Sequence, residues 1–324
     1  MKKLLMLKLV LGIACLLFWV SAQAQEKYPR RPIELVVPAT PGGVNDTSAR
    51  TYSKELGRIL NTPITVVNRG GGAGTIGTSY VIRAKKDGYT LLNSSPNLVI
   101  QPIINKEVNF DPLKDLIHIG QFGTVPIAFC VREDSPFHTL GELIEYARKN
   151  PGKLKFGASG MGSVDYFNVQ ILASKTNIKM VAIPFRGGGQ TLISLLGGNV
   201  DLTFMTLTTQ GGQIKAGKIR GLATSTKNRN PEFPNIPTFT ELGYPYPFII
   251  PWFGIFSSAG LPQSVLNVLM PAVEKAFKNP ELAQQAIRFG MTVDYLGPKE
   301  FRKLIESQFK TVEKIARDVN LIKK

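Results

Sequence analysis

The sequence predicts an α/β fold of two similar lobes arranged as a clamshell. Between residues 33 and 93, short runs rich in β-branched residues alternate with segments of helical spacing. A second alternation of the same kind follows between residues 126 and 205. The remaining C-terminal segment cannot form a lobe of its own, so we expect it to return to the first lobe. The chain would then cross between the lobes twice.

The first 24 residues are expected to be a signal peptide, outside the fold. A lysine-rich start precedes an uninterrupted apolar run over 9–20, and small residues over 21–24 fit cleavage after Ala24. Cys15 lies inside the apolar run, which is the wrong place for a lipid-modified cysteine, so a membrane anchor is the second interpretation. We therefore expect an exported, periplasmic protein in which the remaining cysteine, Cys130, is a buried thiol.

The first lobe opens with a βαβαβ pattern. Residues 33–38 are the first expected strand, and Asp46 is expected to cap the helix that follows. Strands are expected over 64–68 and 89–93, with a helix over 75–85 between them. This order predicts a mostly parallel sheet with helices on its faces.

The second lobe repeats the alternation after a turn at residues 111–112. The segment Thr139-Leu-Gly-Glu142 has the spacing of a capping box and predicts a helix start. Strands are expected over 126–131, 154–158, 179–184 and 200–205, with helices over 163–174 and 189–196.

In the C-terminal segment, a strand over 252–257 is expected to precede three helices that begin near Pro262, Pro280 and Pro298. We expect the first lobe to comprise residues 25–124 and 226–324, and the second lobe to comprise residues 125–225.

The chain is basic, with a formal net charge of +16. Cleavage after Ala24 would remove three lysines and no acidic residue, which leaves +13. Such an excess suits nucleic acid, an anionic surface or an acidic ligand. The lysines and arginines are scattered and are not interleaved with aromatic residues, so we expect a solvated basic surface and no nucleic-acid site.

Two glycine-rich segments match nucleotide-binding patterns only in part. Gly72-Ala-Gly-Thr-Ile-Gly77 has dinucleotide-binding spacing, but it does not follow the first strand, and Asp87 comes only ten residues later. Gly212-Gln-Ile-Lys-Ala-Gly-Lys218 resembles a P-loop, but Ile219 replaces the magnesium-binding hydroxyl residue. We therefore expect no cofactor.

The two histidines offer no catalytic or metal-binding pattern. Neither His118 nor His138 has a cysteine, histidine or carboxylate at metal-ligand spacing. The sequence contains no G-x-S-x-G nucleophile motif. We expect neither a metal site nor an enzyme.

Three glycine-rich turns, over 38–46, 157–163 and 184–189, each follow an expected strand. Ligands of open α/β sheets bind beyond the carboxyl ends of strands, where helix N-termini offer free N–H groups and a partial positive charge. Such turns can hold an anion, with serine and threonine hydroxyls as further donors. The candidate ligand-binding residues are Thr40, Pro41, Gly42, Gly43, Asn45, Asp46, Ser94, Ser95, Ser159, Gly160, Gly162, Ser163, Arg186, Gly187 and Thr206.

A longer pattern also carries a resemblance. It begins as Tyr28-Pro-x-x-Pro-Ile-x-Leu-Val-Val-Pro-x-x-Pro-Gly-Gly-x-x-Asp46-x-x-Ala49-Arg50. It continues, in order, through Asn68-Arg-Gly-Gly-Gly-Ala-Gly74, Asp87-Gly-Tyr-Thr-Leu91, Pro184-Phe-Arg-Gly-Gly188 and Leu196-Gly-Gly-Asn-Val-Asp201. Over essentially the whole mature chain, this resembles the solute-binding proteins of tripartite tricarboxylate transporters, the Bug family.

The resemblance implies a periplasmic binding-protein fold of the type II-like clamshell class, a small carboxylate between the lobes and a membrane permease as partner. In that family the loop matching residues 40–46 meets one carboxylate, often through ordered water, and the turn matching 157–163 grips from the other lobe. Two positions depart from the family pattern. A frequent histidine is Tyr166 here, which we include among the ligand-binding residues, and a frequent aspartate is Thr206.

The loss of an acidic residue at position 206 disfavours a ligand with a free amino group and leaves dicarboxylates, tricarboxylates and aromatic acids open. The expected function is a monomeric periplasmic receptor that delivers an organic acid to a transporter. Two alternatives belong to other classes. One is an exported α/β hydrolase, against which the missing catalytic triad argues, and the other is a sensor that signals through a membrane partner.

Overall fold

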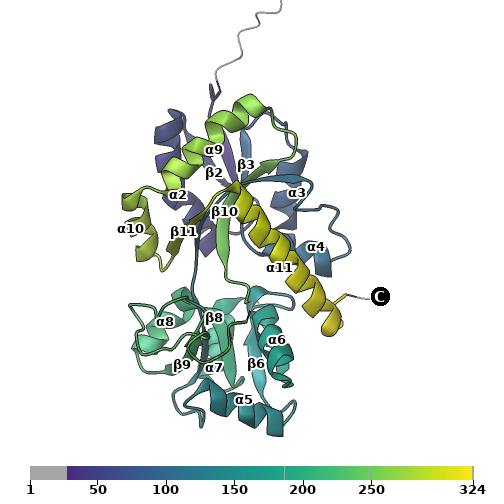
Figure 1. Cartoon of the computed structure of the whole chain (residues 1–324), viewed down its shortest axis with the longest axis vertical. Coiled ribbons are helices and arrows are strands. Elements are labelled where there is room, and N and C mark those ends of the chain that lie inside the picture. Colours follow the sequence, from purple (N-terminus) through teal and green to yellow (C-terminus); the bar gives the residue numbers. More distant parts are fainter. Residues whose placement is uncertain (1–27, 186, 247, 323–324) are drawn as a thin grey trace, which may run out of the picture.

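Two β-sheets, each covered by helices, form the upper and lower halves of the molecule in Figure 1. The computed structural model describes residues 28–322 except 186 and 247, so the expected signal peptide with Cys15 lies outside the described residues. One sheet has six strands in the order β11-β4-β10-β3-β1-β2, and the other has five in the order β7-β6-β8-β5-β9. The predicted two-lobe α/β fold is confirmed.

The upper half contains the six-stranded sheet. Its strands are β1 (Ile33–Val37), β2 (Ile64–Asn68), β3 (Thr90–Ser94), β4 (Leu116–Thr124), β10 (Trp252–Ser258) and β11 (Thr292–Leu296). Its helices are α2 (Val44–Leu60), the short η1 (Gly72–Gly74), α3 (Thr75–Arg83), α4 (Asn97–Ile104), α9 (Gln263–Phe277), α10 (Pro280–Arg288) and α11 (Pro298–Asp318).

The lower half contains the five-stranded sheet. Its strands are β5 (Ile127–Arg132), β6 (Lys155–Ala158), β7 (Val181–Pro184), β8 (Leu202–Thr206) and β9 (Ile219–Thr224). Its helices are α5 (Leu140–Lys149), α6 (Val164–Thr176), α7 (Gly188–Leu196) and α8 (Leu207–Lys215). The capping box of α5 is confirmed, because the Glu142 N–H donates to Thr139 Oγ1 at 3.2 Å and Glu142 Oε2 accepts from the Thr139 N–H at 3.2 Å.

The sheets are mixed, so the expectation of a mostly parallel sheet was wrong. Strand β1 pairs in parallel with β2 and β3, but β10 is antiparallel to both β3 and β4. The reason is the path of the chain: β4 runs out of the upper half towards β5, whereas β10 re-enters it after β9. The two crossovers pass side by side, and the Val125 N–H donates to the carbonyl oxygen of Pro251 at 2.8 Å.

The segment after β9 packs against the lower half, although the expected boundary at 225/226 assigned it to the first lobe. Phe233 and Ile236 share a buried cluster with Cys130 of β5. The ring of Phe239 lies 5.3 Å from that of Phe204 on β8. We therefore propose that the second lobe extends to about residue 250, where the return crossover begins, and that the first boundary lies at 124/125.

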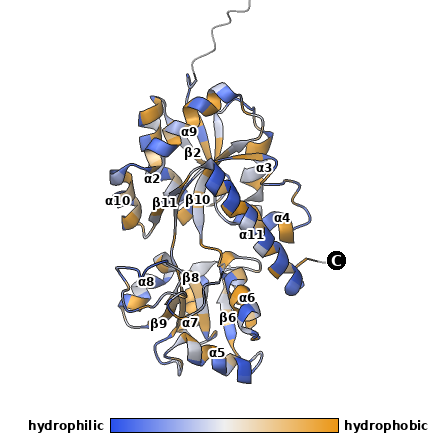
Figure 2. Cartoon of the chain, viewed as in Figure 1, coloured by the Kyte–Doolittle hydropathy of each residue, from blue (hydrophilic) through white to orange (hydrophobic). Residues whose placement is uncertain are grey.

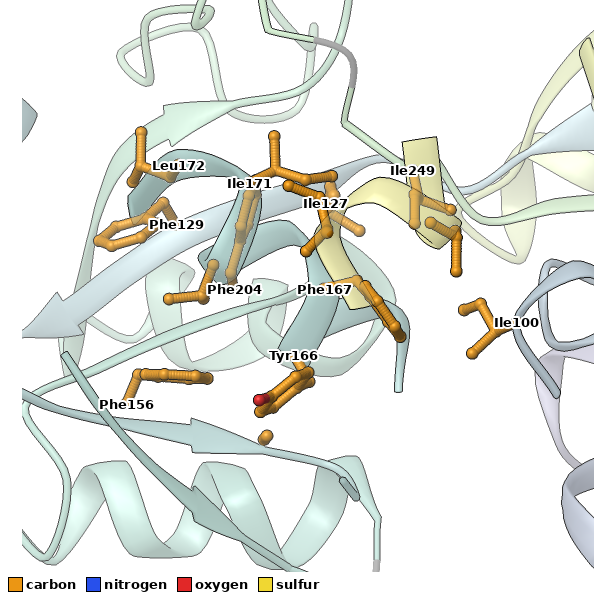
Figure 3. Packing of buried hydrophobic residues seen from close by; sticks show 14 of the residues in the cluster. Ile100, Ile127, Phe129, Phe156, Tyr166, Phe167, Ile171, Leu172, Phe204 and Ile249 are labelled. Carbon is orange, nitrogen blue, oxygen red and sulfur yellow. The ribbon is translucent and has the colours of Figure 1, made fainter. Parts of the chain in front are cut away.

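The halves also meet through a shared core beside the crossovers. Asn168 of α6 is fully buried, and its side chain donates to the carbonyl oxygen of Ile249 at 2.9 Å and accepts from the Ile249 N–H at 2.7 Å. Figure 3 shows Ile100 of α4 on the side of this cluster where Phe167 and Ile249 lie. Helix α11 contacts both α4 and α6, and Figure 2 shows its outward face as largely hydrophilic.

The stability of the ligand-free protein is expected to fall as the pH drops from 6.5 to 4, because His118 of β4 is buried beside the rings of Phe256 and Phe301. Burial, assisted by the positive charge of Arg302, lowers the pKa of His118 to about 4. In the unfolded chain His118 is protonated as the pH falls through about 6.5, whereas in the folded chain it stays neutral until the pH approaches 4. The loss approaches about 1.4 kcal/mol per pH unit across this window.

Urea unfolding at several pH values between 7 and 4 would measure this loss. His118→Phe is expected to flatten the profile relative to the exposed control His138→Phe. Identical slopes in the two variants would contradict a role for His118.

Candidate functional site

A cavity of about 530 Å³ lies between the two halves. Helices α2 and α4, the short η1 and strand β10 of the upper half contribute to its wall, together with β5, β8 and the turns before α6 and α7 of the lower half. The lining residues are Val44, Ala73, Ser95, Pro96, Asn97, Gln101, Ile127, Ser159, Gly160, Met161, Gly162, Ser163, Val164, Asp165, Gly188, Phe204, Met205, Thr206, Thr209, Pro251 and Phe253.

Five helices begin at this wall. The lining residues Val44, Asn97, Val164 and Gly188 are the first residues of α2, α4, α6 and α7, and Thr206 is the N-cap of α8. The first N–H groups of a helix have no partner within it, and its N-terminus carries a partial positive charge. None of the described lining residues is a lysine or arginine. The helix starts therefore supply main-chain donors for an anion, beside one lining carboxylate, that of Asp165, which is bound to Ser159.

The turn between β6 and α6 is held by Asp165. Its Oδ2 accepts from the Ser159 N–H at 2.5 Å, and its Oδ1 accepts from the Ser159 hydroxyl at 2.7 Å. The Ser163 hydroxyl donates to the carbonyl oxygen of Gly160 at 2.7 Å and accepts from the Tyr166 N–H at 3.3 Å, which caps α6. These bonds fix the backbone of the turn at the edge of the cavity.

Asp46 does not cap α2, which begins two residues earlier with Gly43 as its N-cap. Instead, its carboxylate folds back and accepts hydrogen bonds from the Gly42 N–H at 2.9 Å, Arg50 Nε at 3.0 Å and Asn68 Nδ2 at 3.0 Å. Burial alone would raise the pKa of Asp46, but these bonds outweigh it and lower the pKa below its usual value. Asp46 thus braces the loop after β1.

A smaller cavity of about 200 Å³ lies within the upper half and shares Ala73, Ser95 and Asn97 with the larger one. Asn45 and Ser94 are also in its wall. Asn93 fixes this corner, because its Nδ2 donates to the carbonyl oxygen of Asn45 at 2.8 Å and its Oδ1 accepts from the buried Tyr52 hydroxyl at 2.7 Å. Burial raises the pKa of Tyr52 well above its usual value, so the hydroxyl stays a donor.

The structure gathers part of the predicted site. Ser95, Ser159, Gly160, Gly162, Ser163 and Thr206 line the large cavity, and Asn45, Ser94 and Ser95 line the small one. Thr40, Pro41, Gly42, Gly43, Asp46, Tyr166 and Gly187 are described but line neither cavity, and Arg186 lies outside the described residues.

Tyr166 is buried in the core of the lower half. It is 5% exposed, and its ring packs against those of Phe156 and Phe167, as Figure 3 shows. Burial raises the pKa of its hydroxyl. Tyr166 therefore packs in the core of the lower half and does not contribute to the cavity wall.

Sequence reasoning missed two groups of lining residues. Asn97 and Gln101 lie on α4, which was not predicted, although polar residues four apart in the apolar segment 97–104 are a signal for one polar helical face. Ile127, Phe204 and Phe253 lie in expected strands, where the sequence pattern does not distinguish a cavity wall from a core.

Among the described residues, no group of three or more His, Cys, Asp or Glu residues could hold a metal ion. Cys130 is buried, and burial raises the pKa of its thiol. No helix in the described ranges is long and apolar enough to cross a membrane.

Three comparisons with known proteins agree with this geometry. A family model described as "Tripartite tricarboxylate transporter family receptor" matches residues 48–321. The protein BugT of Bordetella pertussis is 28% identical over 312 residues, which cover 95% of this chain and 96% of BugT. A TctC solute-binding protein from Polaromonas, solved without ligand, is 28% identical with a TM-score of 0.78, over 90% of this chain and 99% of that one.

A protein from R. palustris solved with adipate is also 28% identical, with a TM-score of 0.76, over 90% of this chain and 97% of that one.

Proposed function

The chain belongs to the family of tripartite tricarboxylate transporter receptors, and from this membership we propose that it binds a small organic carboxylate in the cavity between its lobes. It would hand this ligand to a membrane transporter. The similarity to BugT and to a relative solved with adipate supports the proposal. We further propose that the protein acts as a periplasmic monomer without catalytic activity, after cleavage behind Ala24.

The observation that carries the proposal is the convergence of five helix N-termini on one cavity. A carboxylate placed there can accept hydrogen bonds from N–H groups at these helix starts, and it neutralises the partial positive charge of several helices at once. The groups come from both lobes. Binding would therefore draw the lobes together about the paired crossovers, which is a hinge closure.

Thermal unfolding of the mature protein with a panel of organic acids tests this function. A ligand that binds only the folded chain at 100 times its Kd adds about 2.7 kcal/mol of stability, which is a rise of about 5 °C in Tm for a protein of this size. We expect at least one carboxylate to produce such a rise, and the corresponding alcohol or amide to produce none. Absence of any shift, together with turnover of an ester, would favour an exported hydrolase instead.

A further inference from the structure

The edge of the lower half that points away from the cavity carries a group of cationic side chains. Strand β6 ends beside the cavity-lining Ser159, and helix α6 begins there at Val164, so the start of β6 and the end of α6 lie at the opposite edge. In Figure 1, helix α5 forms this lower end of the molecule. The edge exposes six cations, which we call the basic end: Arg148, Lys149, Lys153, Lys155, Lys175 and Lys179.

Hydrogen bonds bring the segments of the basic end together. Arg148 Nη2 at the end of α5 donates to the carbonyl oxygen of Thr176 at the end of α6, at 3.4 Å. The Gly152 N–H, in the loop between α5 and β6, donates to the carbonyl oxygen of Lys179 at 2.9 Å. Cations that are scattered along the sequence are therefore neighbours in the fold.

Few acidic groups balance the charge of the basic end. Within residues 28–322, apart from 186 and 247, none of its six cations forms an ion pair with a carboxylate. Two exposed acidic residues belong to this edge. Glu145 lies on α5, and Asp201 Oδ2 accepts a hydrogen bond from the main-chain N–H of Lys155 at 2.7 Å. The six cations thus outnumber the acidic groups beside them.

Farther along the same edge, at the end of β5, charges of opposite sign are paired. Arg132 lies 3.0 Å from Asp134, and Arg220 lies 2.6 Å from Glu133. This part of the edge is therefore closer to neutral, and the excess of positive charge belongs to the side formed by α5, β6 and α6.

Interactions with helix ends account for half of the basic end. A helix C-terminus carries a partial negative charge that favours cations in its last turn. Three of the cations lie in the last turns of α5 and α6: Arg148, Lys149 and Lys175. The other three lie in loops or at the start of β6, where no helix end explains them: Lys153, Lys155 and Lys179.

Two further observations indicate a lipid surface as the partner. Five of the six cations are lysines, which are depleted at protein interfaces, where arginine is enriched. Val181, which pairs with Lys155 on the edge strand β7, is 43% exposed, and Tyr146 of α5 is 40% exposed. Exposed apolar and tyrosine side chains among lysines suit the headgroup region of a membrane.

We propose that the basic end rests on an anionic phospholipid surface and holds the receptor beside the membrane. The cavity lies at the other edge of the lower sheet, so this attachment leaves it open to ligand. The proposal goes beyond ligand capture and is independent of which acid the cavity binds.

Co-sedimentation of the mature protein with lipid vesicles tests the proposal. We expect binding to vesicles of phosphatidylcholine mixed with phosphatidylglycerol and none to phosphatidylcholine alone. Each cation near an anionic surface contributes about fivefold in affinity. Neutralising four of the six should weaken binding about 100-fold, in a variant that combines Lys149→Gln, Lys153→Gln, Lys175→Gln and Lys179→Gln. Salt at about 1 M, where the Debye length is about 3 Å, should release the unaltered protein.

A control variant removes the same charge from the upper half. It combines exposed lysines that form no ion pair in the described part of the chain: Lys54→Gln, Lys106→Gln, Lys299→Gln and Lys310→Gln. This variant should lose no more than about threefold in vesicle affinity. Thermal unfolding of both variants checks that they remain folded.

The outcomes distinguish three kinds of attachment. Equal losses in the two variants would overturn the proposal, because net charge alone would then explain the binding. Absence of binding to the anionic vesicles, or equal binding to the neutral ones, would also overturn it. Binding to polyglutamate but not to vesicles would assign the basic end to an acidic protein segment instead of a lipid surface.

Discussion

Replacement of Gly188 by leucine is expected to abolish ligand binding while the protein stays folded. Gly188 is the first residue of α7 and lines the large cavity. A Cβ atom there would lie 3.4 Å from Thr209 Cγ2 and 3.8 Å from Met205 Sδ, which are ordinary contacts, and the backbone is not in the left-handed region. The rest of the leucine side chain has to enter space that the ligand needs. Overpacking of this kind corresponds to a loss of about 100-fold in affinity.

The neighbouring residue is the matched control. Gly189 is exposed, an added Cβ would meet nothing within 4 Å, and it does not line the cavity. Gly189→Leu should therefore bind ligand as tightly as the unaltered protein, with a similar Tm. Calorimetry on both variants measures the difference, and retained binding in Gly188→Leu would show that the cavity is not the ligand site.

Asn168→Leu is expected to lower the free energy of unfolding by about 3 kcal/mol, because it leaves two buried main-chain groups without hydrogen-bond partners. The leucine side chain has the same branching and number of heavy atoms as that of asparagine, but it contains no polar atom. The N–H and carbonyl oxygen of Ile249 both bond to the Asn168 side chain, and both would lose their partner beside the return crossover. Denaturant unfolding of the ligand-free protein measures the loss.

Asn267→Leu on α9 provides the control for this substitution. Asn267 is exposed, and its side chain accepts a hydrogen bond from the exposed Gln263, so the change should remain within about 0.5 kcal/mol. A decrease of less than about 1 kcal/mol in the free energy of unfolding of Asn168→Leu would mean that water or local rearrangement provides hydrogen bonds to the main chain of Ile249. The two hydrogen bonds between Asn168 and Ile249 would then contribute little to stability.

Features with local causes could be predicted from the sequence. The capping box at Thr139 depends on residues three positions apart, and the strands of the βαβαβ opening follow from residue type and spacing. The mixed sheets could not be predicted in this way, because β4 and β10 pair across more than 100 residues of intervening chain. Helix α4 was missed since it is short and contains Pro102.

The same distinction between local and long-range causes applies to the candidate site. Its serine and glycine turns follow strand ends, so a general rule about α/β sheets selected Ser159, Gly160 and Ser163 as candidates, and the structure places them in the cavity wall. The loop over 40–43 follows a strand equally well, yet Asp46 draws it back towards Asn68. Such hydrogen bonds between distant residues decide which of several similar turns reaches the cavity. The sequence pattern does not reveal these bonds.

The convergence of five helix starts has a consequence for how this receptor can change over evolutionary time. Here main-chain amides attract the anion. Substitution of the side chains around the cavity leaves these amides in place, so the attraction is retained. A lining residue outside the core, such as the half-buried Val44, can then be exchanged, and each exchange changes the shape of the cavity while the main-chain donors remain. A single ancestral scaffold can in this way yield receptors for many different acids, with the acid group recognised by what all of them share.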